Sequence, residues 1–229
     1  QSIIAPKQVP TLSHFINQNS LIKDNTNQFI DLEIPSKSVE DVFTNYYHNM
    51  TNSSTTNKIW GCGSKETVSG PGSTLQNTSY LREKLQQFIT KYNIQSILDL
   101  GCGDFNWMKR IVQQNPYLTY KGIDIVKELV ESNNKQYKTN RISFDYKDII
   151  QIDYQQNYND YDLIFCKEVL IHLNLEKSLL FFNNIHKSNC QYLAMNTFSK
   201  SMNKDISIGD HYEINLFYPP FNFKEPLYT

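Results

Sequence analysis

Glycines and a carboxylate follow one predicted strand of this chain at a spacing that suits ligand binding. Residues 96–100 read Ser-Ile-Leu-Asp-Leu, and Gly101-Cys102-Gly103 comes next. A short apolar run that ends in closely spaced glycines predicts a buried strand turning into a helix. We expect both glycines to adopt positive φ and to let a ligand approach the backbone, with the N–H groups of the helix pointing into the turn. In an open α/β sheet, nucleotide-like molecules bind at such a turn.

Further ionisable residues fall at the ends of later predicted strands. Asp124 lies 21 residues beyond Gly103, the interval that one helix and one strand require. Asp148 follows the next strand, and Lys167-Glu168 follows the one after. A carboxylate can accept hydrogen bonds from both hydroxyls of a ribose, which suits Asp124, or from the amine of adenine, which suits Asp148. Structural alternatives are a helix cap for Asp124 and a surface turn for Asp148.

Strands and helices alternate through most of the sequence. Strands are predicted at 96–100, 119–123, 141–146, 161–166 and 191–196, and helices at 38–47, 73–92, 107–114, 127–137 and 175–188. Such alternation implies right-handed crossovers and a parallel sheet covered on both faces. The aromatic tail at 209–229 predicts an antiparallel hairpin. The expected fold is therefore α/β, a Rossmann-like doubly wound, mostly parallel sheet with a C-terminal hairpin and an N-terminal extension. A partly irregular arm at 1–58 precedes the domain at 59–229.

The turn at 99–105 resembles motif I of the class I S-adenosylmethionine-dependent methyltransferases, D/E-x-G-x-G-x-G, with Phe105 at the last glycine. The dinucleotide pattern G-x-G-x-x-G would need a glycine where Asn106 stands, which disfavours a nicotinamide-dependent oxidoreductase. Asp124 and Asp148 match the ribose and adenine acids of this family. The segment Leu-x-His172-Leu is similar to its motif IV.

The resemblance implies S-adenosylmethionine as cofactor and S-adenosylhomocysteine as product. The implied cofactor-binding residues are Trp60, Ser73, Asp99, Gly101, Cys102, Gly103, Asp124, Ile125, Asp148, Ile149 and Lys167. Candidate catalytic residues are His172, whose ordinary pKa lies near neutrality, and the adjacent Glu168 and Lys167. A purely structural role is the alternative for His172, and core packing is the alternative for Trp60. Phe105 is expected to shape the cavity wall near the methionine end of the cofactor.

Two flanking segments resemble one subgroup of this superfamily, known mainly from bacterial and viral sequences. They are Trp60–Ser64 (Trp-Gly-Cys-Gly-Ser) and Gly70–Thr74 (Gly-Pro-Gly-Ser-Thr), followed by Gly103–Met108 (Gly-Asp-Phe-Asn-Trp-Met). A late Asn215-Leu216 and Pro219–Phe223 also match. The resemblance to this subgroup supports the expected cofactor and does not indicate the methyl acceptor.

Composition narrows the classes of partner. The 229 residues carry a net charge of −1, which gives no footprint for nucleic acid, and no apolar run is long enough for a membrane span. We therefore expect O-methylation of a small-molecule or sugar acceptor. The alternatives are an RNA or protein acceptor, or a non-catalytic subunit whose N-terminal arm binds a protein partner.

Four cysteines occur without a Cys-x-x-Cys pair: Cys62, Cys102, Cys166 and Cys190. This pattern predicts free thiols in a reducing compartment, taken as the cytoplasm, and no metal site. A cleaved targeting peptide stays an alternative, since the sequence begins at Gln1.

Overall fold

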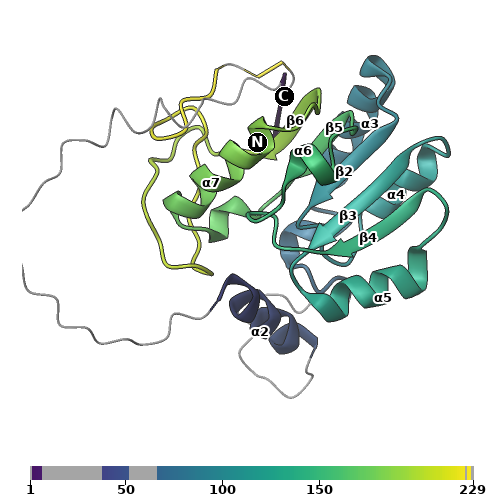
Figure 1. The fold of residues 1–229 in the computed structure, drawn as a ribbon, viewed down its shortest axis with the longest axis horizontal. Coiled ribbons are helices and arrows are strands. Elements are labelled where there is room, and N and C mark those ends of the chain that lie inside the picture. Colours follow the sequence, from purple (N-terminus) through teal and green to yellow (C-terminus); the bar gives the residue numbers. More distant parts are fainter. Residues whose placement is uncertain (1, 7–37, 52–65, 225, 228–229) are drawn as a thin grey trace, which may run out of the picture.

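The computed structural model describes residues 2–6, 38–51, 66–224 and 226–227. In this part of the chain six strands form one sheet, in the order β1-β6-β5-β2-β3-β4 (Figure 1). Five are parallel: β2 (Ser96–Leu100), β3 (Thr119–Asp124), β4 (Ile142–Tyr146), β5 (Leu163–Cys166) and β6 (Tyr192–Asn196). The edge strand β1 (Ser2–Pro6) pairs antiparallel with β6. The predicted doubly wound α/β fold is confirmed.

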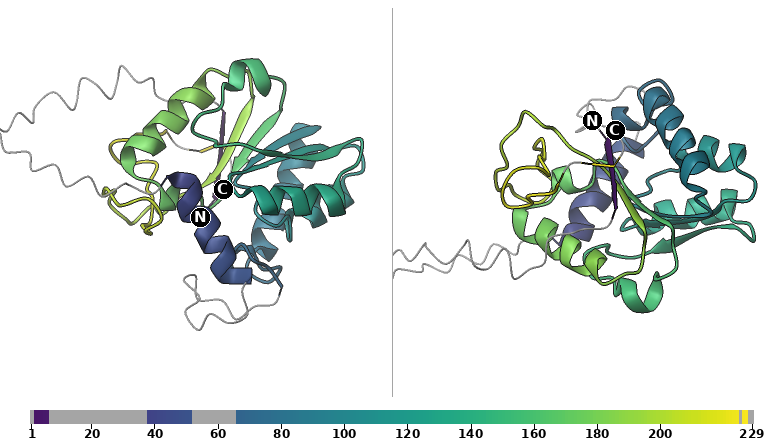
Figure 2. Two further views of the ribbon diagram at one scale, coloured as in Figure 1. Left: turned by 60° about the horizontal axis from the view of Figure 1, so that its bottom comes forward. Right: turned by 90° about the horizontal axis from the view of Figure 1, so that it is seen from above.

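Helices lie on both faces of the sheet (Figure 2). The helices are α2 (Val39–Thr51), α3 (Ser79–Tyr92), α4 (Met108–Gln114), α5 (Lys127–Tyr137), α6 (Tyr154–Asn157) and α7 (Leu175–His186), with short 3₁₀ turns η1 (Pro71–Ser73) and η2 (Leu170–His172). Within the described residues, no helix is both long enough and apolar enough to cross a membrane.

Two apolar clusters form the core, one on each face of the sheet. Successive strand residues point to opposite faces, so Ile97 joins the cluster beneath α3 and α4, while Leu98 joins the cluster beneath α7. Four of the parallel strands, β2, β3, β5 and β6, are mostly buried, as expected for a sheet covered on both sides, whereas the edge strand β4 has only Phe144 buried. The sheet thus forms a rigid support for the groups at its carboxyl edge.

Helix boundaries follow local capping signals. Ser38 and Asp41 cap α2 reciprocally, because each donates its backbone N–H to the side chain of the other. Asn174 caps α7 by accepting from the backbone N–H of Lys177. The helix predicted to start at residue 73 begins only at Ser79, because η1 and a turn occupy the intervening residues.

The predicted C-terminal hairpin is wrong for the described residues of the tail, which contain no strand after β6. Side-chain amides replace a strand ladder there. Asn203 donates to the carbonyl oxygens of Asn215, Tyr218 and Pro219, and it accepts from the N–H of Asn215. Such local bonds compete with strand pairing, and prolines have no N–H to offer. The antiparallel strand of the sheet comes from β1 instead.

Replacing Asn203 with Ala should therefore loosen the tail. Asn215 is 1% exposed, and the variant leaves its N–H without the Asn203 acceptor, at a cost of about 1–3 kcal/mol in the free energy of unfolding. Urea denaturation of Asn203→Ala, compared with the exposed neighbour Lys204→Ala, measures the loss. Equal stability of the two variants would contradict this account of the tail.

Candidate functional site

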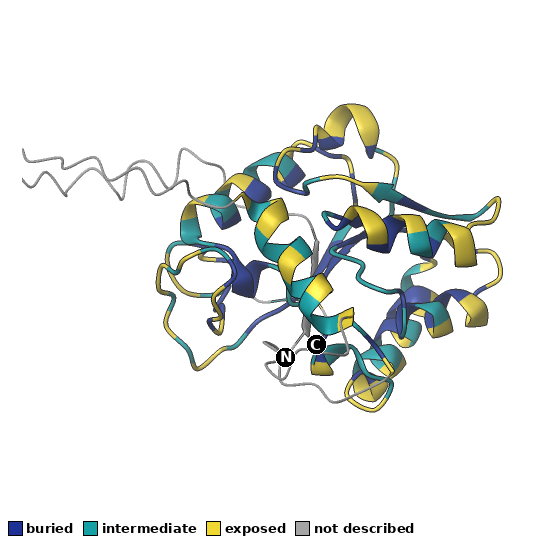
Figure 3. Ribbon diagram, turned by 90° about the horizontal axis from the view of Figure 1, so that it is seen from below, coloured by how far each residue is buried: buried dark blue, intermediate teal, exposed yellow. Residues whose placement is uncertain are grey.

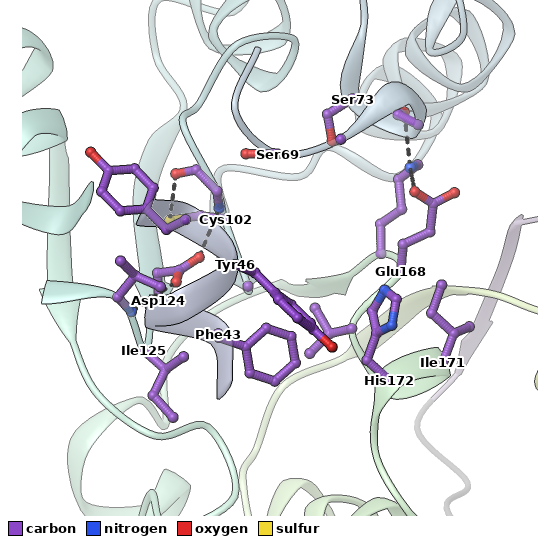
Figure 4. A pocket seen from close by; sticks show the side chains of 18 of the residues that line it. Phe43, Tyr46, Ser69, Ser73, Cys102, Asp124, Ile125, Glu168, Ile171 and His172 are labelled. Carbon is purple, nitrogen blue, oxygen red and sulfur yellow. Dashed lines mark hydrogen bonds and ion pairs between the residues drawn. The ribbon is translucent and has the colours of Figure 1, made fainter. Parts of the chain in front are cut away.

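A cavity of about 510 Å³ opens at the carboxyl ends of the strands. Its position follows from the topology, because β2 lies between β3 and β5 and the chain changes direction in the sheet there. Ligands in open α/β sheets bind at such a switch point. The view in Figure 4 shows Asp124 and Cys102 on one side of the cavity and Glu168 and His172 on the other.

The turn after β2 is fixed to the end of β3. The N–H groups of Gly101 and Cys102 donate to the carbonyl oxygen of Ile123, at 2.8 and 3.0 Å. The N–H of Gly103 donates to Asp124 Oδ2 at 2.9 Å. These amides are therefore not directed at a ligand. Helix α4 starts only at Met108 and contributes no residue to the cavity, so the expectation that its N–H groups would point into the site is wrong.

The two glycines are needed for packing within the protein. Both have positive φ, as predicted, at 76° for Gly101 and 56° for Gly103. A Cβ on Gly101 would lie 2.2 Å from Val169 Cγ2, and one on Gly103 would lie 2.2 Å from Ser69 Oγ. Neighbouring side chains thus occupy the position that a Cβ would take at each glycine, while both glycines still line the cavity.

Both carboxylate oxygens of Asp124 accept hydrogen bonds from the protein backbone. Its second oxygen, Oδ1, accepts from the N–H of Val126 at 3.1 Å, and the residue is 8% exposed. Burial raises the pKa of this carboxyl, and the bonds from Val126 and Gly103 oppose the shift. A carboxylate has about four acceptor positions, so Asp124 keeps acceptor capacity for a hydrogen bond from the cavity.

Asp99 is the most deeply placed acid of the cavity. It is 4% exposed and accepts a hydrogen bond from the Tyr120 hydroxyl at 2.6 Å. Burial raises the pKa of Asp99 to about 7, since the bond from Tyr120 only partly offsets the loss of solvent. Asp99 can therefore change its charge near neutral pH.

At the end of β5, Lys167 and Glu168 form an ion pair, with Nζ and Oε2 2.7 Å apart. Lys167 Nζ also donates to the carbonyl oxygen of Gly72 at 3.1 Å. Glu168 adopts a positive φ of 57°, and its N–H donates to Asn196 Oδ1 at 2.7 Å. The pair joins β5 to the loop before α3.

His172, in η2, is 8% exposed and lines the cavity. Its Nδ1 lies 2.8 Å from the carbonyl oxygen of Asp210. A carbonyl can only accept, so Nδ1 carries the hydrogen and the neutral ring has its lone pair on Nε2. Burial lowers the pKa of His172 despite the bond to Asp210.

The loop at 66–73 is held on the turn at 103–106. The carboxylate of Asp104 accepts from Val68 N at 2.8 Å and from Ser69 Oγ at 3.2 Å. Asn106 Nδ2 donates to Glu66 Oε1 and to the carbonyl oxygen of Ser73. These bonds give a structural reason for the Gly-Asp-Phe-Asn and Gly-Pro-Gly-Ser segments to occur together, which the sequence did not disclose.

Phe105 does not shape the cavity wall, contrary to expectation. It is 2% exposed and packs against Tyr120, Tyr137 and Phe144. Its φ of 58° keeps the left-handed backbone of the missing glycine, while its ring is part of the core. The residue thus fills the core beneath the turn.

The structure brings the predicted site residues together. Every described one lines the cavity: Ser73, Asp99, Gly101, Cys102, Gly103, Asp124, Ile125, Asp148, Ile149, Lys167, Glu168 and His172. Trp60 lies outside the described residues, as does the predicted arm–domain boundary at 58. Among the described residues, no cluster of three or more His, Cys, Asp or Glu side chains is placed to hold a metal ion.

Sequence reasoning missed one wall of the cavity. Five residues of α2 line it: Val39, Phe43, Tyr46, Tyr47 and Met50. His211 of the tail also lines it. The apolar face of α2 was visible in the sequence, but periodicity says only that a helix has a face and not what that face covers.

Comparison with known proteins identifies the family of this chain. Residues 93–211 match the family described as methyltransferase domain. No curated protein matches the sequence.

Several solved structures are similar to the chain. The methyltransferase domain of bacterial CtHen1 is 19% identical, over 47% of this chain and 58% of that one, with a TM-score of 0.40. The plantazolicin methyltransferase BpumL, in complex with a pentazolic desmethylPZN analog and SAH, is 24% identical over 49% and 42%, with a TM-score of 0.35. Magnesium protoporphyrin IX methyltransferase from Synechocystis PCC 6803, with bound SAH, is 14% identical over 65% and 67%, with a TM-score of 0.42. The chain spans less than two thirds of the first two structures.

Removing the Asp104 carboxylate should release the loop at 66–73. In Asp104→Ala the N–H of Val68 loses its acceptor, so we expect amide hydrogen exchange at Val68 and Ser69 to accelerate about tenfold or more. The exposed Asp160→Ala serves as the control. Unchanged exchange in Asp104→Ala would show that the loop is held by other contacts.

The raised pKa of Asp99 predicts a pH dependence of stability. Between about pH 4, its ordinary pKa, and about pH 7, Asp99 is protonated in the folded protein and ionised in the unfolded chain. The unfolded state then binds fewer protons, so the contribution of Asp99 to the free energy of unfolding falls as pH rises through this window.

Asp99→Asn should abolish that contribution and keep the acceptor for Tyr120. Urea denaturation of both proteins from pH 4 to 8 measures the effect, and the variant should gain stability relative to the wild type as pH rises. A constant difference across this range would contradict the raised pKa.

Proposed function

Because the chain belongs to the methyltransferase-domain family, we propose that it transfers a methyl group from S-adenosylmethionine to a hydroxyl of a small-molecule or sugar acceptor. The family match confirms the class predicted from motif I, and S-adenosylmethionine is the cofactor of that class. The acceptor and the methylated atom belong to the proposal.

The single observation that carries this proposal is the shared cavity. Eleven residues were predicted to bind the cofactor, and the ten that are described all border one space of about 510 Å³. Cavities of roughly 300–1,000 Å³ are typical of small-molecule sites. Residues scattered over 95 positions of sequence meet there because their strands end at the same edge of the sheet.

The chemistry of the residues fits the proposed cofactor. Asp124 keeps acceptor capacity for a ribose hydroxyl. Asp148, two residues beyond β4, lines the cavity where it can accept from an adenine amine in addition to Ile150 N and Gln151 Nε2. Ile125 and Ile149 are apolar neighbours suited to the faces of a purine. Asp99, whose pKa is raised to about 7, can carry a negative charge above neutral pH and would then suit a cationic ligand. When bound, S-adenosylmethionine supplies an activated methyl group on a sulfonium, and S-adenosylhomocysteine remains after transfer.

His172 is the proposed general base. Transfer to a hydroxyl forms an O–CH₃ bond, breaks the S–CH₃ bond and releases the hydroxyl proton. The Nε2 lone pair of the neutral imidazole can take that proton, since the bond to Asp210 sets the tautomer. Lys167 and Glu168 lie at the same end of the cavity, where we propose that they orient the acceptor.

The alternative functions require the chain to bind different ligands. A non-catalytic subunit with a partner-binding arm has no need of a cofactor, and an RNA or protein methyltransferase would bind a large acceptor. The arm at residues 7–37 lies outside the described structure. The free thiols of Cys102, Cys166 and Cys190 support the proposed cytoplasmic location.

Calorimetric and thermal-shift titrations with S-adenosylmethionine, S-adenosylhomocysteine and NAD test the cofactor. A ligand at a hundred times its Kd stabilises the folded state by about 2.7 kcal/mol, so both sulfur compounds should raise the midpoint and NAD should not. If neither S-adenosylmethionine nor S-adenosylhomocysteine raises the unfolding midpoint, the proposal is refuted.

Asp124→Ala should weaken cofactor binding, but it also removes the acceptor for Gly103 N and Val126 N. We therefore expect a loss of about 1–3 kcal/mol in the free energy of unfolding as well. Asp148→Ala tests the second acid without disturbing the glycine turn, although it removes the acceptor for Ile150 N and Gln151 Nε2, so its free energy of unfolding is measured as well. Asp160→Ala is the control. Wild-type affinity in both Asp124→Ala and Asp148→Ala would exclude these acids from the cofactor site.

A further inference from the structure

Helix α2 lies across the cavity without being packed as a core helix. None of its residues is fully buried, although its apolar side chains Phe43, Tyr46 and Met50 all line the cavity. In Figure 3 the helix is in front, and its whole length has the colours of exposed and intermediate residues. The apolar face is therefore covered only in part by the protein, and it faces the space where a ligand would lie.

The position of α2 is fixed by contacts with three distant parts of the chain. The Tyr46 hydroxyl donates to the carbonyl oxygen of Gly209 at 2.9 Å. His48 Nε2 lies 3.3 Å from Glu128 Oε1 of α5. The Tyr146 hydroxyl, at the end of β4, donates to Glu40. With its ends and middle held in this way, α2 can act as a stable wall.

Aromatic rings gather around His172. The ring of Phe43 meets His172 edge-on, with centroids 6.2 Å apart, and it meets Tyr46 at 6.1 Å. The ring of His211 lies 5.7 Å from that of His172. Phe198 borders the same space. In Figure 4, Phe43 and Tyr46 lie between the Asp124 side of the cavity and the His172 side.

Few polar groups accompany these rings. Glu168 lines the cavity here and is paired with Lys167, so this pair contributes little net charge. The carboxylate of Asp210 acts on Tyr46 from beside the cavity. Recognition of a sugar uses many hydroxyl partners, whereas aromatic walls favour a flat ring that can pack edge-to-face or offset against them. A hydroxyl on such a ring would approach His172, the proposed base.

We propose that α2, η2 and the tail around His211 form the acceptor subsite, and that it binds a flat aromatic molecule carrying a hydroxyl group. Phe43 and His211 contact the ring of the acceptor and determine specificity. The inference rests on the proposed function, and it selects the phenol-type acceptor over the sugar.

Isothermal titration calorimetry on the 229-residue chain, with and without S-adenosylhomocysteine, tests the subsite. The probes are 4-methylphenol, 4-methylcyclohexanol, which has the same outline without the aromatic ring, and methyl α-glucoside. The phenol should bind at least about fivefold more tightly than either of the other two, because only its ring can make the aromatic contacts.

Substitutions in the proposed subsite test where the phenol binds. Phe43→Ala should weaken the phenol about tenfold, and His211→Ala about threefold, with S-adenosylhomocysteine affinity unchanged in both. Asn45→Ala, exposed on the same helix, and His186→Ala, an exposed histidine remote from the cavity, are the matched controls. Because Phe43 is only partly buried, the folded state should persist, and urea denaturation verifies this.

The outcomes separate the two levels of the proposal. Equal affinity for the three probes, or wild-type phenol affinity in Phe43→Ala, overturns the aromatic subsite even where S-adenosylhomocysteine binds. If S-adenosylhomocysteine fails to bind while Phe43→Ala still weakens the phenol, the subsite stands and the methyltransferase proposal fails.

Discussion

The backbone of Gly101-Cys102-Gly103 is hydrogen-bonded to the end of β3, and the remainder of the site depends on this attachment. Three consecutive N–H groups donate to Ile123 and Asp124, so the turn cannot move independently of the neighbouring strand. This glycine turn also holds the loop at 66–73, through hydrogen bonds of Asp104 and Asn106. That loop accepts the bond from Lys167 at the end of β5. One side of the cavity is therefore connected to the other through the glycine turn.

Several residues around the glycine turn have two roles. Asp124 satisfies the backbone N–H groups of Gly103 and Val126, and the same residue lines the cavity. Lys167 neutralises Glu168 and also holds the loop before α3. A site whose groups are already oriented loses less entropy when a ligand binds. Substitution of Asp124 therefore removes bonds that hold the fold as well as a group that lines the cavity.

Local patterns predicted much of the fold. The bounds of β2 and α5 agree with the predicted 96–100 and 127–137, because their apolar periods and flanking residues are local properties. The family inferred from the glycine segment is confirmed by the match over residues 93–211. The tail hairpin and the early start of α3 were wrong, since side-chain amides and a 3₁₀ turn override strand and helix propensities there. The role given to Phe105 was also wrong, because it depends on neighbours from other elements.

The sequence by itself determined the alternation of strands and helices, the positive φ at Gly101 and Gly103, and the acids that would meet at one sheet edge. These follow from residue type and from spacing along a single strand or turn. Only the tertiary structure decided that α2 forms a wall of the cavity. That wall depends on contacts such as Tyr46 with Gly209, which are 163 residues apart, and no local pattern specifies such a pairing. It also decided that neighbouring side chains fill the space beside both glycines, since packing selects partners by shape in three dimensions.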